Sequence, residues 1–145
     1  MNVRPIRGSD RSGWEPLWIG YLDFYETPQA DRMVDDTFAR LCDPAADIHG
    51  LVAEEGGQLV GLAHYLFHAD TWQPEGRCYL NDLFTGGDAR GRGVGEALIE
   101  AVADACRARG AAKLYWLTQE FNVTARRLYD RVGEVTPFIR YVKPL

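Results

Sequence analysis

The run from Leu80 to Ile99 constrains the fold of this chain most strongly, because an apolar strand passes through a glycine-rich turn directly into an amphipathic helix. Gly91, Gly93 and Gly95 leave the backbone amides uncovered where that helix begins. The first N–H groups of a helix lack intrahelical partners and lie at the positive end of the helix dipole. Glycine also lets a ligand approach the main chain closely. The sequence therefore predicts a turn that binds a diphosphate through backbone amides.

The spacing of the glycines excludes two common phosphate loops. A Walker loop requires a Lys-Ser or Lys-Thr pair after its glycines, and none follows here. A dinucleotide-binding fingerprint requires a third glycine where this chain has Glu96. The remaining pattern is Arg90-x-x-Gly93-x-Gly95 directly after a strand. It resembles the pyrophosphate loop of the GNAT superfamily of acetyl-CoA-dependent N-acetyltransferases.

The resemblance continues towards the C-terminus. In that superfamily a later strand is followed by Asn-x-x-Ala and then a tyrosine on one helix, and here Asn122-Val123-Thr124-Ala125 leads to Tyr129. The stretch of residues 115–130 and the ending at 138–141 look most like the small Hpa-type acetyltransferases. Members of that group acetylate histone tails, polyamines or D-amino acids, so the resemblance implies an amine substrate without naming one.

Length and composition favour one domain with a core of its own. The chain has 145 residues, of which 46% are hydrophobic and 12% aromatic. We therefore expect residues 1–145 to form a single GNAT domain. No apolar run approaches the roughly 20 residues that span a bilayer, and the N-terminus lacks the hydrophobic region of a signal peptide. These features predict a cytoplasmic protein without a membrane partner.

Charge and cysteine content limit the classes of ligand, metal and cross-link that this chain is expected to have. A net charge of −5 argues against a nucleic-acid surface and suits a cationic substrate better. Cys42, Cys78 and Cys106 are odd in number and widely spaced, which predicts reduced thiols and neither a disulfide framework nor a zinc site. His64 and His68 lie in a strand and loop context, so we expect no metal.

Hydrophobic periodicity predicts an α/β sandwich with a mixed sheet and at least one parallel crossover around the helix that follows the glycine turn. Strands are predicted at 3–6, 49–55, 59–67, 77–85 and 113–118, with a final extended segment at 134–142. Helices are predicted from a cap at residue 9 or 10 through residue 25, from a Thr27 cap with Pro28 as the first helical residue through residue 41, at 94–109, and from an Asn122 cap through residue 132. The resemblance implies a GNAT-like, mostly antiparallel sheet with helices on both faces. In it, a central parallel pair, 79–85 and 113–118, splays apart to admit the coenzyme.

The resemblance also implies where acetyl-CoA, the cosubstrate, would bind. The backbone of Leu83, Phe84 and Thr85 would pair with the pantetheine arm, which Asn122 would also contact. The diphosphate would be held by the turn itself, at Arg90, Gly91, Arg92, Gly93, Val94 and Gly95.

Two side chains are candidates for proton transfer. Tyr129 is the candidate general acid, because a phenol near the sulfur can donate to the departing thiolate; the alternative is a ring packed on the core. In some polyamine-acetylating relatives a glutamate of the fourth strand is the base, but Asn81 occupies that position here. Asp82 is the candidate base instead. Strand alternation would direct it to the opposite face unless a bulge re-aims it, so a structural carboxylate is the alternative.

The acceptor amine is expected between the turn that links the first two helices and the catalytic strands. Asp23 and Glu26 flank Tyr25 near that turn and are candidate partners for a cation. The alternative is an aromatic stripe that belongs to the core, with solvated carboxylates beside it.

The sequence also leaves one alternative function open and predicts an oligomeric state. One alternative function is a non-catalytic acyl-CoA-binding or regulatory GNAT-like module that has lost efficient chemistry. The chain after Gly133 is also too short for a long final hairpin. This leaves an edge strand free to pair with a second subunit and predicts a homodimer.

Overall fold

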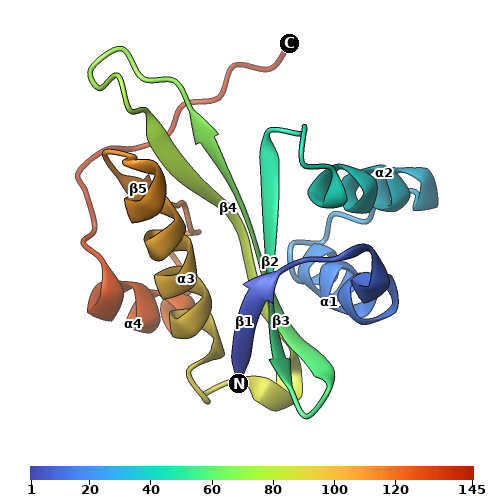
Figure 1. The fold of residues 1–145 in the computed structure, drawn as a ribbon. Helices are drawn as coiled ribbons and strands as arrows, with labels where there is room; N and C mark the ends of the chain where they lie inside the picture. Colours follow the sequence, from blue (N-terminus) through green and yellow to red (C-terminus); the bar gives the residue numbers. More distant parts are fainter.

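The computed structural model describes residues 1–145 and contains one five-stranded sheet in the order β1-β2-β3-β4-β5 (Figure 1). The strands are β1 (Asn2–Pro5), β2 (Ile48–Glu55), β3 (Gln58–His68), β4 (Arg77–Thr85) and β5 (Leu114–Tyr115). Neighbours from β1 to β4 are antiparallel, and β4 pairs with β5 in parallel. The parallel pair therefore lies at one edge of the sheet and not at its centre, where it was predicted.

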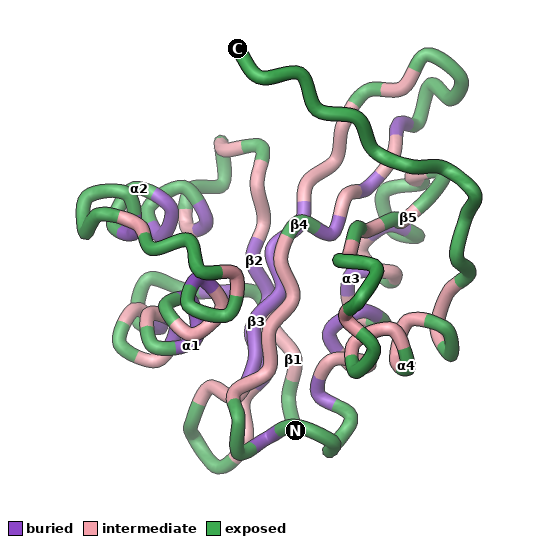
Figure 2. The backbone as a smooth tube through the Cα atoms, turned by 180° about the vertical axis from the view of Figure 1, so that it is seen from behind, coloured by how far each residue is buried: buried purple, intermediate pink, exposed green.

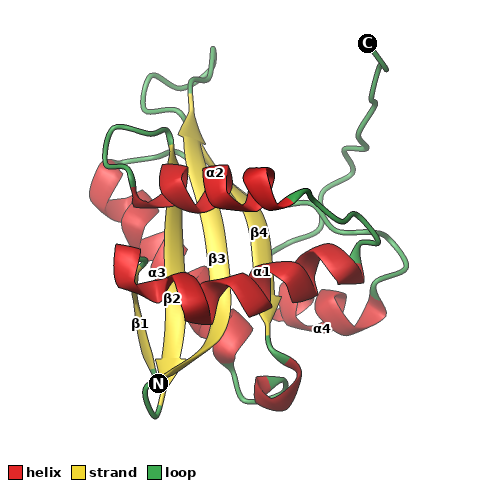
Figure 3. Cartoon of the chain, turned by 90° about the vertical axis from the view of Figure 1, so that its right-hand side faces the viewer, coloured by secondary structure: helices red, strands yellow, loops and turns green.

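Helices cover both faces of the sheet, as predicted. Helices α1 (Arg11–Phe24) and α2 (Asp31–Cys42) lie on one face, and α3 (Val94–Arg109) and α4 (Val123–Val132) lie on the other (Figures 1 and 3). Short 3-10 turns, η1 (Gly8–Asp10) and η2 (Gly87–Ala89), precede α1 and follow β4. None of these helices combines the length and the apolar character needed to cross a bilayer.

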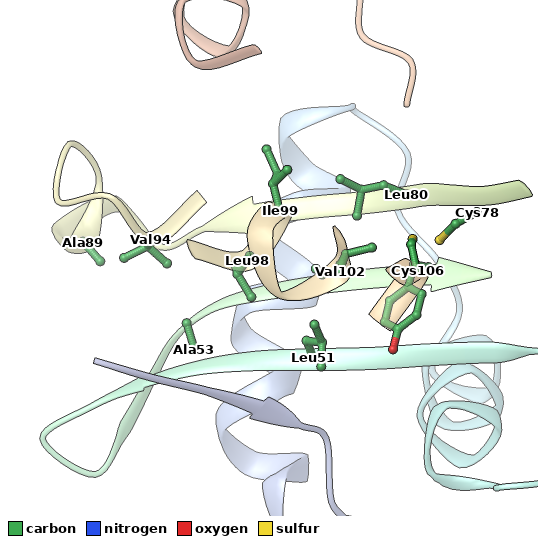
Figure 4. Packing of buried hydrophobic residues seen from close by; sticks show 12 residues of the cluster. Leu51, Ala53, Cys78, Leu80, Ala89, Val94, Leu98, Ile99, Val102 and Cys106 are labelled. Carbon is green, nitrogen blue, oxygen red and sulfur yellow. The ribbon is translucent and has the colours of Figure 1, made fainter. Parts of the chain in front are cut away.

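Two hydrophobic clusters hold the layers together, because alternate residues of the central strands face opposite helices. On β3, Leu62 packs in the cluster beneath α1 and α2, while Ala63 packs beneath α3. The α3 cluster includes Leu98 and Val102, which are completely buried against the sheet (Figure 4). Burial of both sheet faces explains why the central strands are almost continuous apolar runs.

The hairpin predicted between the second and third strands is confirmed. Gly56 and Gly57 have φ values of +56° and +80°, and Glu55 pairs directly with Gln58. Two consecutive residues with positive φ favour the right-handed twist of the flanking strands, and glycine adopts this conformation without steric cost.

The structure corrects the predicted start of the second helix. It begins at Asp31 rather than at Pro28. The Thr27 hydroxyl donates to the Tyr25 carbonyl at 2.9 Å and therefore stabilises the preceding turn instead of capping the helix. The Ala30 carbonyl accepts the first bonds of the helix.

Two predicted extended segments are shorter or unpaired. Only Leu114 and Tyr115 of the predicted strand 113–118 pair with β4. Residues 134–145 form no strand, and the whole segment is exposed (Figure 2). The alternation of apolar residues at 134–142 is therefore not matched by a strand partner within this chain.

Candidate functional site

The turn between β4 and α3 presents unpaired backbone amides. Gly91 and Gly93 have φ values of +77° and +83°, and α3 begins at Val94. The first backbone bond of the helix runs from Ala97 N to Gly93 O, at 3.0 Å. The N–H groups of residues 91–96 donate to no carbonyl of the protein. This arrangement suits an anion, because the free donors coincide with the positive end of the α3 dipole.

Two guanidinium groups flank this turn. Arg90 Nε donates to the Thr85 carbonyl at 3.4 Å, and the Arg90 guanidinium lies 5.8 Å from the centre of the Phe84 ring. Arg92 forms an exposed ion pair with Glu55 at 3.1 Å. Both arginines therefore remain at the surface beside the free amides, where they add positive charge.

A cleft of about 700 Å³ lies between α1, α2 and the sheet. Its lining combines aromatic, apolar and polar side chains; the polar and aromatic members include Trp18, Tyr21, Tyr25, Thr27, Gln29, Thr37, Arg40, His64, Asn81, Asp82 and Arg140. The cleft holds a single carboxylate, that of Asp82, and two arginines. It is large enough for a small molecule or a side chain and its backbone.

A bulge in β4 turns Asp82 towards this cleft. Asp82 pairs with His64 and Leu80 pairs with Tyr65, so Asn81 has no partner residue on β3. Leu80 and Leu83 both pack in the cluster beneath α3, although they are three residues apart. Alternation is therefore broken between them, and the extra residue moves Asp82 to the face covered by α1. The bulge that the sequence reasoning required is present.

The Asp82 carboxylate is the end of a buried hydrogen-bonded chain. Its Oδ2 lies 3.0 Å from His64 Nδ1, and His64 Nε2 lies 3.0 Å from Trp14 Nε1. Asn81 Nδ2 donates to Asp82 Oδ1 at 3.1 Å. Sequence reasoning missed His64 because it considered histidines only as metal ligands; the available signal was a histidine at a position of β3 that faces an aromatic helix.

Tyrosines surround the same carboxylate. Burial raises the pKa of Tyr21 far above its ordinary value, and the negative charge of Asp82 raises it further. Burial and then Asp82 likewise raise the pKa of Tyr25. Burial also raises the pKa of Tyr79. These phenols therefore stay protonated and act as hydrogen-bond donors or polar walls of the cleft.

Tyr129 lies on α4, next to a narrow gap between β4 and β5. Its ring meets Trp116 edge to face, with centroids 5.5 Å apart. Burial raises the pKa of Tyr129 to about 12. The gap, of about 20 Å³, is lined by Tyr129, Trp116 and Leu83 together with residues that also line the cleft, among them Tyr25 and Asn81. Tyr129 therefore lies close to the inner end of the cleft.

The facing edges of β4 and β5 separate next to this gap. Their parallel pairing ends at Tyr79 and Tyr115. Beyond that pair, Leu83 on β4 and Leu117 after β5 both line the gap, and no strand pairing joins them. A chain-like ligand that entered there would find backbone donors and acceptors to pair with.

The remaining predicted residues have varied surroundings. Tyr25 lines the cleft, whereas Asp23 and Glu26 are exposed and lie outside its lining. Asn122 Oδ1 accepts from Ala125 N at 3.4 Å and so caps α4, as predicted. Its Nδ2 donates to Thr118 Oγ1 at 3.5 Å. Both polar atoms of the Asn122 amide are thus engaged within the protein.

Sequence comparison identifies the family. Residues 14–133 match the model of the acetyltransferase (GNAT) family. The chain is 36% identical over 141 residues to the D-amino-acid N-acetyltransferase HPA3 of Saccharomyces cerevisiae, covering 96% of this chain and 88% of the yeast protein. It is 35% identical over 146 residues to the uncharacterized N-acetyltransferase YhfO of Bacillus subtilis, covering 97% and 95% of the two chains.

Solved structures agree on the fold. A ribosomal-protein-alanine N-acetyltransferase from Brucella melitensis biovar Abortus 2308 superposes with a TM-score of 0.85 at 21% identity, covering 99% of each chain. The aminoglycoside N-acetyltransferase AAC(6')-Iy in complex with CoA superposes with a TM-score of 0.72 at 21% identity, covering 99% of this chain and 100% of the other. The chain therefore belongs to the GNAT family of acetyltransferases and is an N-acetyltransferase, an enzyme that transfers an acetyl group to an amine.

Proposed function

We propose that this enzyme takes the acetyl group from acetyl-CoA and transfers it directly to the primary amine of a small amino acid bound in the cleft. The observation that carries the coenzyme part is the row of unpaired amides at 91–96, next to a helix N-terminus. Such a row fits a diphosphate. The Arg90 and Arg92 side chains add positive charge nearby, and the adenosine end of the coenzyme would lie at this exposed surface.

Acetyl-CoA supplies an activated thioester, and the task of the protein is to place the amine against it. The main chain of Leu83, Phe84 and Thr85 would pair with the pantetheine arm where β4 and β5 separate. Asn122 would also contact this arm. The gap beside Leu83 adjoins the cleft, because Tyr21, Tyr25 and Asn81 line both. Holding both reactants in attack geometry is worth roughly 7–11 kcal/mol of the barrier in the best cases.

Tyr129 is proposed as the general acid. A thiolate leaves when the amine displaces it, and a thiol has a pKa of about 8.5. Since the pKa of Tyr129 is raised to about 12, its hydroxyl keeps its proton at neutral pH and is available to the sulfur. A donated hydrogen bond or proton would stabilise the thiolate as it departs.

Asp82 is proposed as the base that accepts the proton of the acceptor ammonium. It is the single carboxylate in the cleft lining, and only a small part of its side chain is exposed. The same negative charge attracts the ammonium before reaction. The bulge at Asn81 is the local feature that makes this role available.

An amino acid suits the charges of the cleft better than a polyamine. Arg140 lines the cleft and forms no ion pair, while Arg40, also in the lining, is held by Asp36 at 2.8 Å. A carboxylate next to the reacting amine would pair with Arg140 while the amine meets Asp82. A polyamine would instead bring a second cation towards these arginines. The yeast relative is named for D-amino acids.

The experiment is an assay of thiol release from acetyl-CoA with matched acceptors. We expect turnover with free amino acids, weaker turnover with their carboxamides, and little with spermidine. Arg140→Gln should raise the KM for amino acids about tenfold or more and leave the KM for carboxamides unchanged. Equal loss with both acceptors would refute the role of Arg140. Calorimetric binding of acetyl-CoA without any amine-dependent turnover would instead support the alternative of a non-catalytic module.

We also propose that the chain forms a single GNAT domain that assembles as a homodimer through its C-terminal segment. Phe138, Ile139 and Tyr141 are 87%, 77% and 89% exposed. An extended apolar segment of this kind is stabilised when a second copy covers it, beside the free edge at β5. Sedimentation should give a dimer for the wild type and a monomer for Phe138→Asp; a monomeric wild type would contradict this proposal.

We propose a cytoplasmic location because the cysteines of this chain are free thiols. Cys42, Cys78 and Cys106 are all unbridged. Cys78 and Cys106 are buried beside each other, and burial raises the pKa of both. Neutral, buried thiols fit a reducing compartment. Fractionation of cells that express the chain tests this location.

A further inference from the structure

We propose that His64 is a positioning residue that holds the Asp82 carboxylate towards the acceptor amine, and that Trp14 fixes the tautomer in which His64 does so. The inference rests on the proposed function of Asp82 as the base. The three side chains come from α1, β3 and β4, and they form a continuous hydrogen-bonded chain.

The direction of each hydrogen bond follows from Trp14. An indole N–H only donates, so His64 Nε2, 3.0 Å away, must accept and carry no proton. A neutral imidazole then carries its proton on Nδ1. That N–H points at Asp82 Oδ2, which lies 3.0 Å away. The network therefore assigns one tautomer, in which His64 donates to the carboxylate.

Burial makes this assignment rigid. Trp14 has no exposed surface and His64 is 4% exposed. Trp14 stacks on Trp18 with centroids 5.9 Å apart, and the Trp18 ring lies 5.0 Å from the His64 ring. A buried donor or acceptor without a partner is costly, so rotation of the His64 ring would break both bonds at once.

The arrangement reverses the familiar order of a catalytic triad. There, a carboxylate orients a histidine whose second nitrogen meets the substrate. Here, the second nitrogen is occupied by a buried indole, and the carboxylate faces the cleft. Both ring nitrogens are committed, so His64 cannot carry away the proton that Asp82 accepts. That proton must leave through the cleft, and the role of His64 is positional.

Other polar groups around the carboxylate define the background for any pH test. Asn81 donates to its other oxygen, and Tyr21 of α1 and Tyr25, the residue after α1, lie near it with raised pKa values. The pKa of Tyr79 on β4 is raised by burial and also by the charge of Asp82. The charged side chains that line the same cleft are Arg40 of α2 and Arg140 of the C-terminal segment. Because the pKa values of these three phenols are raised, the phenols keep their protons below pH 9 and add no ionisation in that range.

Replacement of His64 separates orientation from packing. His64→Asn keeps a donor near the Nδ1 position, whereas His64→Leu fills similar space without any donor. We expect His64→Leu to lower kcat about 10- to 100-fold with unchanged KM for acetyl-CoA, and His64→Asn to recover at least a tenfold part of that loss. Thermal melting curves of both variants check that they are folded. Equal kcat values for two folded variants would overturn the proposal.

Replacement of Trp14 tests the tautomer lock. Trp14→Phe preserves an aromatic ring but removes the N–H, so Nε2 becomes free to bind a proton. An imidazolium beside Asp82 would make the carboxylate a weaker base. We expect kcat near the wild-type value at alkaline pH and, as the pH falls, an additional loss that the wild type does not show. A pH profile that superposes on that of the wild type would overturn the role of Trp14.

A spectroscopic measurement is independent of the reaction. Long-range ¹H–¹⁵N NMR of the wild type should identify His64 as the tautomer with a protonated Nδ1 and a bare Nε2 between pH 6 and 8. The opposite tautomer, or a doubly protonated ring, would overturn the inference. If the spectrum agrees but no amine is acetylated, the proposed function fails; if amines are acetylated with a different tautomer, only this inference fails.

Discussion

Gly95, in the first turn of α3, lies directly against Leu128 of α4, and a Cβ at residue 95 would lie 3.0 Å from Leu128 Cδ2. The two helices are also joined by an ion pair between Glu96 and Arg131 at 2.6 Å. The turn with the free amides and the helix that carries Tyr129 are therefore in direct contact. The contact fixes the position of the proposed acid relative to the proposed diphosphate site.

Gly95→Ala should accordingly disturb catalysis more than folding. The added methyl group pushes Leu128, and with it α4, by a few tenths of an ångström. Since a displacement of 1 Å can cost about 100-fold in rate, we expect kcat to fall roughly 3- to 10-fold. Gly87→Ala is the matched control, because a Cβ there has no neighbour within 4 Å. Equal kcat values for the two variants would show that the contact is not important.

Tyr129→Phe should lower kcat about 10- to 1,000-fold and leave the KM for acetyl-CoA nearly unchanged, because only the donor to the departing sulfur is lost. The raised pKa, about 12, adds a prediction for the wild type. Its acid form persists as pH rises, so no loss of activity below pH 10 should be traced to Tyr129. Tyr115→Phe, outside the cleft and bonded to His68, is the control. Unchanged turnover in Tyr129→Phe would remove this residue from the mechanism.

Gly93→Ala should weaken coenzyme binding selectively, because Gly93 has a left-handed backbone conformation. Its φ of +83° strains any residue with a Cβ by about 1–2 kcal/mol, although the space around it is open. A turn that relaxes to avoid this strain loses its amide alignment, and we expect the Kd of CoA to rise about 5- to 30-fold. Gly57→Ala, with φ +80° in the β2–β3 hairpin, carries comparable strain and should leave this Kd unchanged in calorimetry.

Much of this fold can be predicted from local sequence signals. Proline, glycine and alternating apolar residues defined β4 correctly to the residue at Arg77–Thr85, and Gly110 marked the end of α3. The glycine turn was identified because its amides depend on backbone geometry alone. The start of α2 was wrong because Thr27 bonds to a turn carbonyl, a choice that the local pattern does not distinguish from a helix cap.

Features that depend on pairing between distant segments were harder to predict. The length of β5 depends on where it separates from β4. The conformation of residues 134–142 depends on whether a strand is available to pair with them. The bulge at Asn81 was recognised only as a condition for Asp82 to act. His64 gains its meaning from Trp14, 50 residues away, and Asp82, 18 residues away, so no local motif reveals it.

A partly buried ion pair near the N-terminus predicts how stability depends on pH. Arg4 donates two bonds to Asp10, at 2.8 and 2.9 Å, and the hydrogen bonds from Arg4 lower the pKa of Asp10 below 3.8. A lowered folded-state pKa contributes stability that is present above the unfolded value and is lost as pH falls through the folded value. Asp10→Asn should therefore cost roughly 1.5–3 kcal/mol in urea unfolding at pH 7.

The same variant should approach the wild type in acid. Below about pH 3.8 the wild-type carboxyl becomes protonated, first in the unfolded and then in the folded state. The difference in free energy of unfolding should shrink as the pH falls below about 4. A difference that stays constant over this range would mean that the Asp10 charge is not the cause. Asp88→Asn, at an exposed position of η2, is the control and should have little effect.

The most direct test of the account is a crystal structure of the protein with bound CoA. We predict that the diphosphate accepts hydrogen bonds from backbone N–H groups within residues 91–96, and that the sulfur lies within reach of the Tyr129 hydroxyl. A diphosphate bound elsewhere, with these amides facing solvent, would contradict it.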